Sequence, residues 1–163
     1  ISFENITLLK EKAAAVRNTE QRYKSLFDHS PMTMLEIDVT ALVNYLEQKK
    51  ITSIDKLDAA WKVLKKQKLV SYFVPLNIND SALVLFEVST KESLLSSLPK
   101  LIDLEDVIYQ QLRMMVELND SYSFKTSIKT FKEKTLQAEF IVTIPQVDNK
   151  RKFGNTIVVI SIP

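Results

Sequence analysis

Few side chains in this sequence could carry out chemistry by themselves. The 163 residues include no cysteine, one histidine (His29) and one glycine (Gly154). Without cysteine, the chain cannot form disulfides, thiolate metal sites, a cysteine nucleophile or a cysteinyl adduct with a flavin. One imidazole cannot build a histidine-rich metal centre, and one glycine cannot supply the glycine-rich loops that hold nucleotide phosphates. Most classes of enzyme therefore lose their usual catalytic groups.

Glu36 is a charged residue inside the first predicted strand, residues 32–38. If Glu36 pointed into the core, its carboxylate would need a partner, or its pKa would rise. A small α+β enzyme with Glu36 as its base is one hypothesis, but no second polar group converges on Glu36 in the pattern. We favour an outward-facing Glu36 and predict that the chain is not an enzyme.

The other candidate ligands for a metal or a haem have structural interpretations. His29 falls in a predicted turn, and Met114 and Met115 fall on a predicted helix, where methionine commonly fills gaps in a core. The acidic residues within 103–106 occupy a first helical turn, which the helix dipole already favours. We therefore predict neither a haem nor a metal site.

Charge and hydropathy limit the partners. Lys and Arg number 22 against 20 Asp and Glu, and the net charge of +2 gives no general attraction for nucleic acid. No apolar run approaches the ~18 residues of a membrane span, so this segment is not predicted to cross a membrane. With 45% hydrophobic residues, a chain of this length can bury the core of one domain.

Residues 1–28 are predicted to form a linker and dimerisation helix with a narrow apolar seam. Seam residues recur at spacings of three, four and three as far as Val16, and Glu20 interrupts the pattern before Tyr23. The helix is predicted to end before Pro31. The seam residues are Ile6, Leu9, Ala13, Val16 and Tyr23. We predict that they pair with a second copy of the chain. The alternative is that the seam packs only on the domain's own sheet.

Residues 29–163 are predicted to form one α+β domain. After the strand at 32–38, apolar residues repeat at helical spacing over about 39–68, which indicates an inserted pair of amphipathic helices. A second strand, rich in β-forming residues, is predicted over 70–78.

The polar side of the second inserted helix is rich in lysine. Its lysines are Lys62, Lys65, Lys66 and Lys68. We interpret this side as a solvated face, and the alternative is a surface that contacts phosphate or lipid.

Three short helices are predicted after the second strand. The first covers residues 80–86 with Asn79 as its cap, and the second begins after a capping box at 89–92. The third begins after Asp103 and ends near residue 119.

The last third of the chain alternates apolar and polar residues. Residues 122–129 and 136–144 have the period of two that is typical of antiparallel strands with one wet face. Residues 157–162 are mostly apolar, so we expect cover on both faces of this strand, with the N-terminal helix on the second face. The elements together predict a five-stranded antiparallel sheet with helices on one face, plus the N-terminal helix and the inserted helix pair.

This order and four short motifs resemble the PAS sensor fold. Residues 22–31, RYKSLFDHSP, resemble the entry segment R-Y-x-x-L-F-[DE]-x-[SA]-P, and residues 77–86 are similar to D-x-N-x-A-A-x-x-L-[FY], with Asn79 on the characteristic asparagine. Residues 89–95 resemble the helix S-x-E-E-L-L-G, and residues 160–163 resemble the terminal strand.

Two departures from the PAS pattern stand out. The usual D-x-x-G hairpin between the first two strands is replaced, after Asp38, by the predicted helix pair. This replacement resembles a subgroup with a helical insertion, found in bacterial sensor histidine kinases and related signalling proteins. Ser96 also stands where the family has a glycine.

The resemblance implies a cytoplasmic bacterial sensor that acts as a homodimer. It would detect a small molecule, or relay a conformational signal, to a histidine kinase or GGDEF-type effector beyond Pro163. A flavin adduct and haem are not expected, and a small organic ligand would lie in the cup between sheet and helices. Candidate pocket residues are Met34, Glu36, Ile78, Phe86, Leu98, Val107, Leu112, Ile128 and Phe140. The alternative is a ligand-free interaction or dimerisation module of the same fold, with a core filled by side chains.

Overall fold

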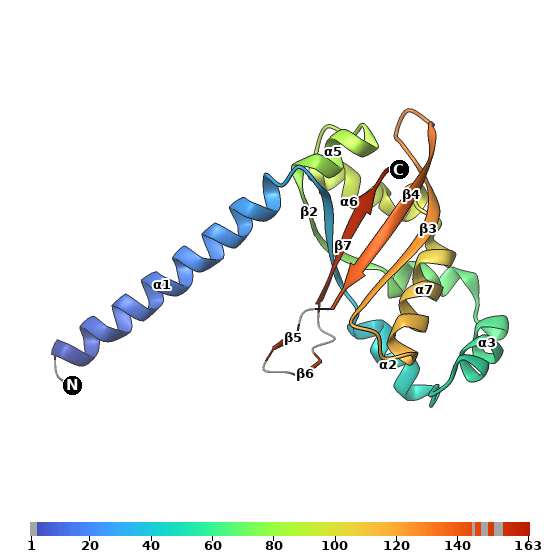
Figure 1. Ribbon diagram of the computed structural model, residues 1–163, viewed down its shortest axis with the longest axis horizontal. Helices are drawn as coiled ribbons and strands as arrows, with labels where there is room; N and C mark the ends of the chain where they lie inside the picture. Colours follow the sequence, from blue (N-terminus) through green and yellow to red (C-terminus); the bar gives the residue numbers. More distant parts are fainter. Residues whose placement is uncertain (1–2, 145, 148–149, 152–154) are drawn as a thin grey trace.

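The computed structural model describes residues 3–144, 146–147, 150–151 and 155–163 and contains one five-stranded antiparallel sheet. Figure 1 shows its strands, whose order across the sheet is β2-β1-β7-β4-β3. The bounds are β1 (Thr33–Asp38), β2 (Val74–Ile78), β3 (Ser121–Lys129), β4 (Thr135–Thr143) and β7 (Asn155–Ser161). Two short strands, β5 (Gln146–Val147) and β6 (Lys150–Arg151), pair separately. The predicted fold class is confirmed.

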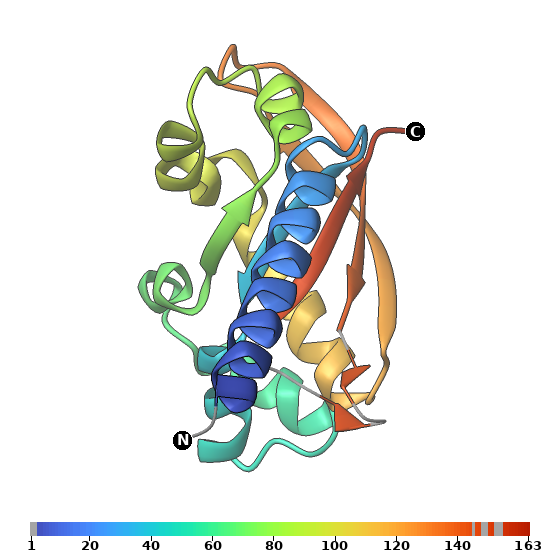
Figure 2. The ribbon, with the colours of Figure 1, turned by 90° about the vertical axis from the view of Figure 1, so that its left-hand side faces the viewer.

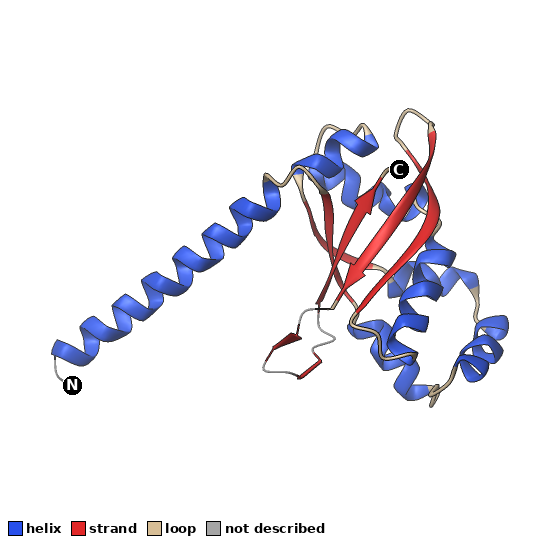
Figure 3. Ribbon diagram, in the orientation of Figure 1, coloured by secondary structure: helices blue, strands red, loops and turns tan. Residues whose placement is uncertain are grey.

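Helices fill most of the chain outside the sheet, as Figure 3 shows. The helix that begins the chain is α1 (Phe3–Asp28). The insertion between β1 and β2 holds α2 (Thr40–Gln48), α3 (Ile54–Val63), the 3-10 turn η1 (Lys66–Lys68) and α4 (Leu69–Tyr72). Between β2 and β3 lie α5 (Asp80–Phe86), α6 (Lys91–Leu101) and α7 (Leu104–Val116).

One hydrophobic core lies between the helices and one face of the sheet. Along β4 the buried residues Ala138, Phe140 and Val142 alternate with more exposed ones, as expected for a strand with one covered face. The cover is formed by α5 against β1, α6 against β2 and β3, and α7 against β3. Leu42 and Leu57 of the insertion are also fully buried in this core. The insertion is therefore part of the folded domain.

The second strand begins later than the sequence predicts. Residues 70–73 belong to α4 and its end, and β2 starts at Val74. Leu69 and Phe73 are both buried and are four residues apart, so one helical turn places them on the same side. Burial of these two side chains outweighs the β-propensity of the residues between them.

Two helix caps lie where the pattern predicts, and a third differs by one residue. The side chains of Asn79 and Asp103 accept hydrogen bonds from the backbone N–H groups at the starts of α5 and α7. At the start of α6 the cap is Thr90, whose hydroxyl accepts from the backbone N–H of Ser93, whereas the predicted box placed Ser89 in this role. The side chain of Ser53 caps α3 in the same way.

The prediction that the N-terminal helix covers the second face of the sheet is wrong. Figures 1 and 2 show α1 extending away from the sheet, joined to it at its C-terminal end. Residues 5–26 are all exposed, and the outward side chains Ile157 and Val159 of β7 remain half-buried. A seam only one residue wide fits the groove of another helix better than the flat face of a sheet.

Candidate functional site

Most of the predicted pocket residues face the interior of the cup. They share a fully buried position within one apolar cluster, which is contributed by strands and helices far apart in the sequence. The residues are Ile78, Phe86, Leu98, Val107, Leu112, Ile128 and Phe140. Their side chains are aliphatic or aromatic, so this wall can bury an apolar body but cannot orient it by hydrogen bonding.

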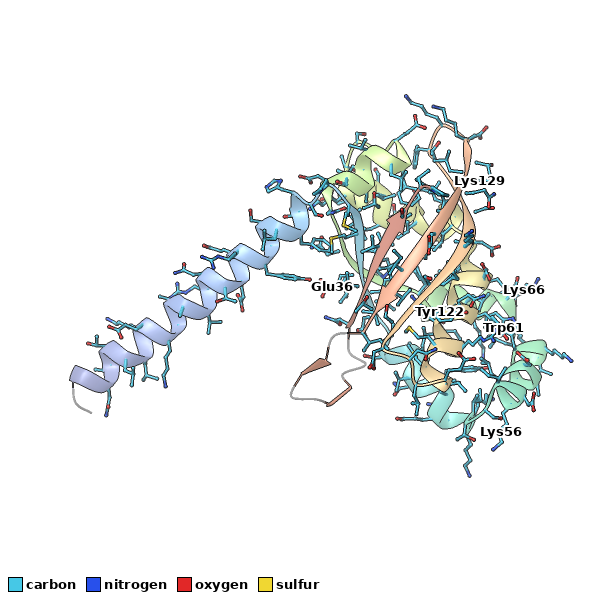
Figure 4. The ribbon with its side chains drawn as sticks, viewed as in Figure 1. Glu36, Lys56, Trp61, Lys66, Tyr122 and Lys129 are labelled. Carbon is cyan, nitrogen blue, oxygen red and sulfur yellow. The ribbon has the colours of Figure 1, made fainter. Side chains whose placement is uncertain are left out.

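Met34 and Glu36 lie on the opposite face of the sheet and are not retained as pocket residues. The strand β1 buries Thr33, Leu35 and Ile37, and the residues between them turn outward because successive side chains alternate. The carboxylate of Glu36 accepts a hydrogen bond of 2.9 Å from Nδ2 of Asn155, and Figure 4 shows Glu36 at the outer side of β1. The favoured outward position of Glu36 is confirmed.

Gln111 is the polar side chain that the sequence reading missed. It lies on α7 and is 1% exposed, yet neither its Oε1 nor its Nε2 has a hydrogen-bond partner among the described residues. The hydroxyls of Thr126 and Thr156 are also buried without a partner there. Such a group costs about 1–3 kcal/mol of stability. The helical period could have revealed Gln111, which is three residues after Ile108 and four after Val107 on the buried stripe.

Asn79 joins the start of β1 to the start of α5. It is 0% exposed, and its Oδ1 accepts hydrogen bonds from the backbone N–H groups of Met34 (3.0 Å) and Ala82 (3.2 Å). Its Nδ2 donates to the backbone carbonyl of Met32 at 2.7 Å. One amide thus links the start of β1 to the first turn of α5.

The C-terminal end of α1 is anchored to the domain. Nζ of Lys91, the first residue of α6, is 2.9 Å from Oδ1 of Asp28, and Phe27 is buried beside this link. The ring of Tyr23 stacks on Phe27 with centroids 6.1 Å apart. Partial burial raises the pKa of Tyr23, and the nearby carboxylate of Glu36 raises it further. The direction of α1 is therefore coupled to the sheet and to α6.

The predicted dimer seam is on the surface. Ile6, Leu9, Val16 and Tyr23 are large apolar side chains exposed to solvent, and Ala13 is also exposed. The alternative in which these residues pack on the domain's own sheet does not describe this structure, because all five are exposed.

The remaining charged groups near the cup are at the surface. His29 faces Asp80 at 3.3 Å, and both side chains are more than half exposed, in agreement with its predicted place in a turn. Within the described residues, no three His, Asp or Glu side chains gather as metal ligands would. Over the same residues, every helix is too short or too polar to pass through a lipid bilayer.

Comparison with known proteins gives matches at the level of structure. No protein-family model matches the sequence, and no curated protein matches it. The PAS domain of a protein from Colwellia psychrerythraea has a TM-score of 0.56 and 12% identity, over 89% of this chain and 96% of that one. The PAS domain of an HTR-like protein from Haloarcula marismortui has a TM-score of 0.53 and 12% identity, over 94% of this chain and 99% of that one.

A domain of a sensory box sensor histidine kinase/response regulator from Geobacter sulfurreducens is similar to the same extent. Its TM-score is 0.51 at 11% identity, over 89% of this chain and 95% of that one. Matches that span nearly the whole of both chains at such low identity establish a shared fold.

Proposed function

We propose that this chain, which has the fold of a PAS domain, is a sensory module that binds a small polar molecule in its core. Binding changes the conformation of the module, and this conformational signal reaches an effector domain of the same polypeptide. The effector is of the histidine kinase or GGDEF type, and the protein acts in the cytoplasm of a bacterium. One of the structures with this fold comes from a sensor histidine kinase/response regulator, which supports a signalling role of this kind. The module itself performs no catalysis.

The buried amide of Gln111 is the observation that carries this proposal. A core built only for packing would have an apolar residue at position 111, because an unpartnered amide lowers stability. A small molecule with one acceptor and one donor would satisfy both amide atoms. The ligand class is therefore a small organic compound with a carboxyl, amide or hydroxyl group.

Native mass spectrometry tests the proposal directly. Protein purified gently and without denaturant is expected to show a second species, heavier by the mass of a small organic molecule, which disappears after unfolding and refolding. The alternative function, a ligand-free interaction module, predicts one species of the bare polypeptide mass before and after refolding. A sample with no adduct at any stage would favour that alternative.

We further propose that α1 relays the signal as part of a homodimer. An isolated helix is marginally stable in water, and the exposed seam on α1 gives a second copy an apolar surface to cover. Because Asp28 binds Lys91 at the base of α1, a shift of α6 over the core would change the angle of α1. The signal is then a bias between two packings of the dimer, worth about 1–3 kcal/mol.

Charged substitutions on the seam should separate the dimer. Replacing both Leu9 and Val16 by glutamate is expected to weaken the dimer at least about tenfold in sedimentation, because four carboxylates would face each other across the seam. The matched control replaces Leu8 and Ala15 by glutamate, which adds the same charge to α1 away from the seam, and should stay dimeric. A fully dimeric Leu9/Val16 variant would contradict the assignment.

A further inference from the structure

The positive charge of this protein is concentrated on the insertion between β1 and β2. Residues 39–73 contain seven lysines and three acidic residues, a net charge of +4, whereas the whole chain has +2. The other residues together are therefore slightly acidic. Figures 1 and 2 place the helices of the insertion at the end of the sheet opposite α5.

A groove of about 190 Å³ lies within this basic segment. Lysines from three places along the insertion converge on it: Lys49 from the end of α2, Lys65 from the loop after α3, and Lys68 from η1. Among the described residues none of the three has an ion pair or a side-chain hydrogen bond. Other lysines of the segment are engaged, since Lys66 pairs with Glu105 at 3.2 Å and Lys56 donates to Thr52.

The remaining lining of the groove is aromatic and aliphatic. The rings of Tyr45 and Tyr72 lie 5.5 Å apart, and Ala60, Val63 and Leu64 complete the wall. Val63 is 82% exposed and adds an apolar side chain to the lining of the groove. Neither tyrosine hydroxyl makes a hydrogen bond to another described residue, so both remain available as donors.

The charge at the groove is not balanced by the protein. No acidic side chain of the described part of the chain lines the groove. The C-terminal ends of α2 and α3 border it, and each helix end carries the equivalent of about half a negative charge. Two such ends offset about one of the three lysines. A positive excess of about two charges is then left beside an apolar wall.

We propose that this groove binds a phosphate monoester whose organic part is small and apolar. Three ammonium groups and two phenol hydroxyls can donate hydrogen bonds to the phosphate oxygens, and a dianion matches the excess charge. The tyrosine rings and Val63 cover the organic part. The groove is smaller than the sites that bind drug-sized molecules, which limits that part to about one ring or a short chain. The phosphate can belong to a free metabolite or to a lipid headgroup.

Titration with phenyl phosphate tests the proposal. In 15N-labelled protein at low salt, the amide signals near Lys49, Lys65 and Lys68 should shift and saturate, and inorganic phosphate should bind more weakly because it lacks the ring. The double substitution Lys65→Gln and Lys68→Gln is expected to weaken binding of phenyl phosphate at least about tenfold. Sedimentation with vesicles that contain phosphatidic acid, whose headgroup is a phosphate monoester, is compared with sedimentation with phosphatidylcholine vesicles. Binding to the phosphatidic acid vesicles that the same substitutions abolish identifies a lipid headgroup as the source.

The control variant replaces Lys56 and Lys62 by glutamine. It removes the same charge from α3, within the same insertion, but neither residue lines the groove, and Figure 4 shows Lys56 on the outer side of the insertion. Its affinity should fall less than about threefold. An equal loss in both variants would mean diffuse attraction to a basic surface and would overturn the site. Absence of binding to both phenyl phosphate and phosphatidic acid vesicles would overturn it as well.

Discussion

Replacing Asn79 by alanine is expected to lower the free energy of unfolding by about 3 kcal/mol. The substitution removes the cap of α5, which alone contributes about 1 kcal/mol. It also leaves the backbone N–H of Met34 and the carbonyl of Met32 without their side-chain partner at the edge of the core. Urea unfolding followed by far-UV circular dichroism measures the change.

Two further substitutions separate these contributions. Asn77→Ala, two residues earlier, removes only a local bond to the backbone N–H of Ile78 and should cost less than about 1 kcal/mol. Asn79→Asp keeps both acceptor bonds but cannot donate to the carbonyl of Met32, so its loss should lie between those of the two alanine variants. If Asn79→Ala costs no more than Asn77→Ala, the amide does not hold β1 and α5 together.

Local patterns in the sequence were sufficient for most of the fold. The period of two over residues 122–129 and 136–144, which lies within one residue of β3 and β4, and the caps at Asn79 and Asp103 depend on neighbours within one turn or one strand. These features depend on residues close together in the sequence, so they are the same in the folded domain as in the local pattern. The wrong boundary at residues 70–73 arose where local preference and tertiary burial disagree, because Leu69 and Phe73 gain more from a helical turn.

The destination of α1 could not be predicted from its seam. The spacing of Ile6, Leu9 and Val16 shows that one side of the helix is apolar, but not which surface covers that side. Two surfaces competed for it, the outer face of the sheet and a second helix. The structure excludes the outer face of the sheet for residues 5–22, which are exposed to solvent. Pairing with a second helix is a property of the assembly and not of one chain.

The candidate site shows a different limit. Its apolar wall could be predicted, because alternation on strands and the helical stripe identify residues such as Phe140 and Leu112. Gln111 was not predicted to be buried, because glutamine is mostly exposed in folded proteins. Its spacing of three residues from Ile108 nevertheless places it on the buried side of α7. Met34 was misplaced because the first strand buries the odd-numbered residues, a register that only its pairing with β7 fixes.

Replacing Gln111 by methionine should stabilise the ligand-free domain and abolish binding of its ligand. Methionine has nearly the shape of glutamine and no strong hydrogen-bonding group. The cost of burying two amide atoms that have no partner among the described residues therefore disappears. We expect the free energy of unfolding to rise by about 1–2 kcal/mol, measured on refolded protein so that no retained molecule contributes. In native mass spectra of gently purified protein, the adduct of the wild type should be missing.

Gln110→Met provides the matched control one residue away. Oε1 of Gln110 accepts a hydrogen bond from the hydroxyl of Tyr122 at 3.0 Å, and its Nε2 donates to Asp106, so this substitution removes bonds that exist. It should lower the free energy of unfolding by up to about 1 kcal/mol and leave the adduct in place. If Gln111→Met instead destabilises the refolded domain while the adduct persists, the amide of Gln111 serves the packing of α7, and ligand recognition must come from other residues of the cup.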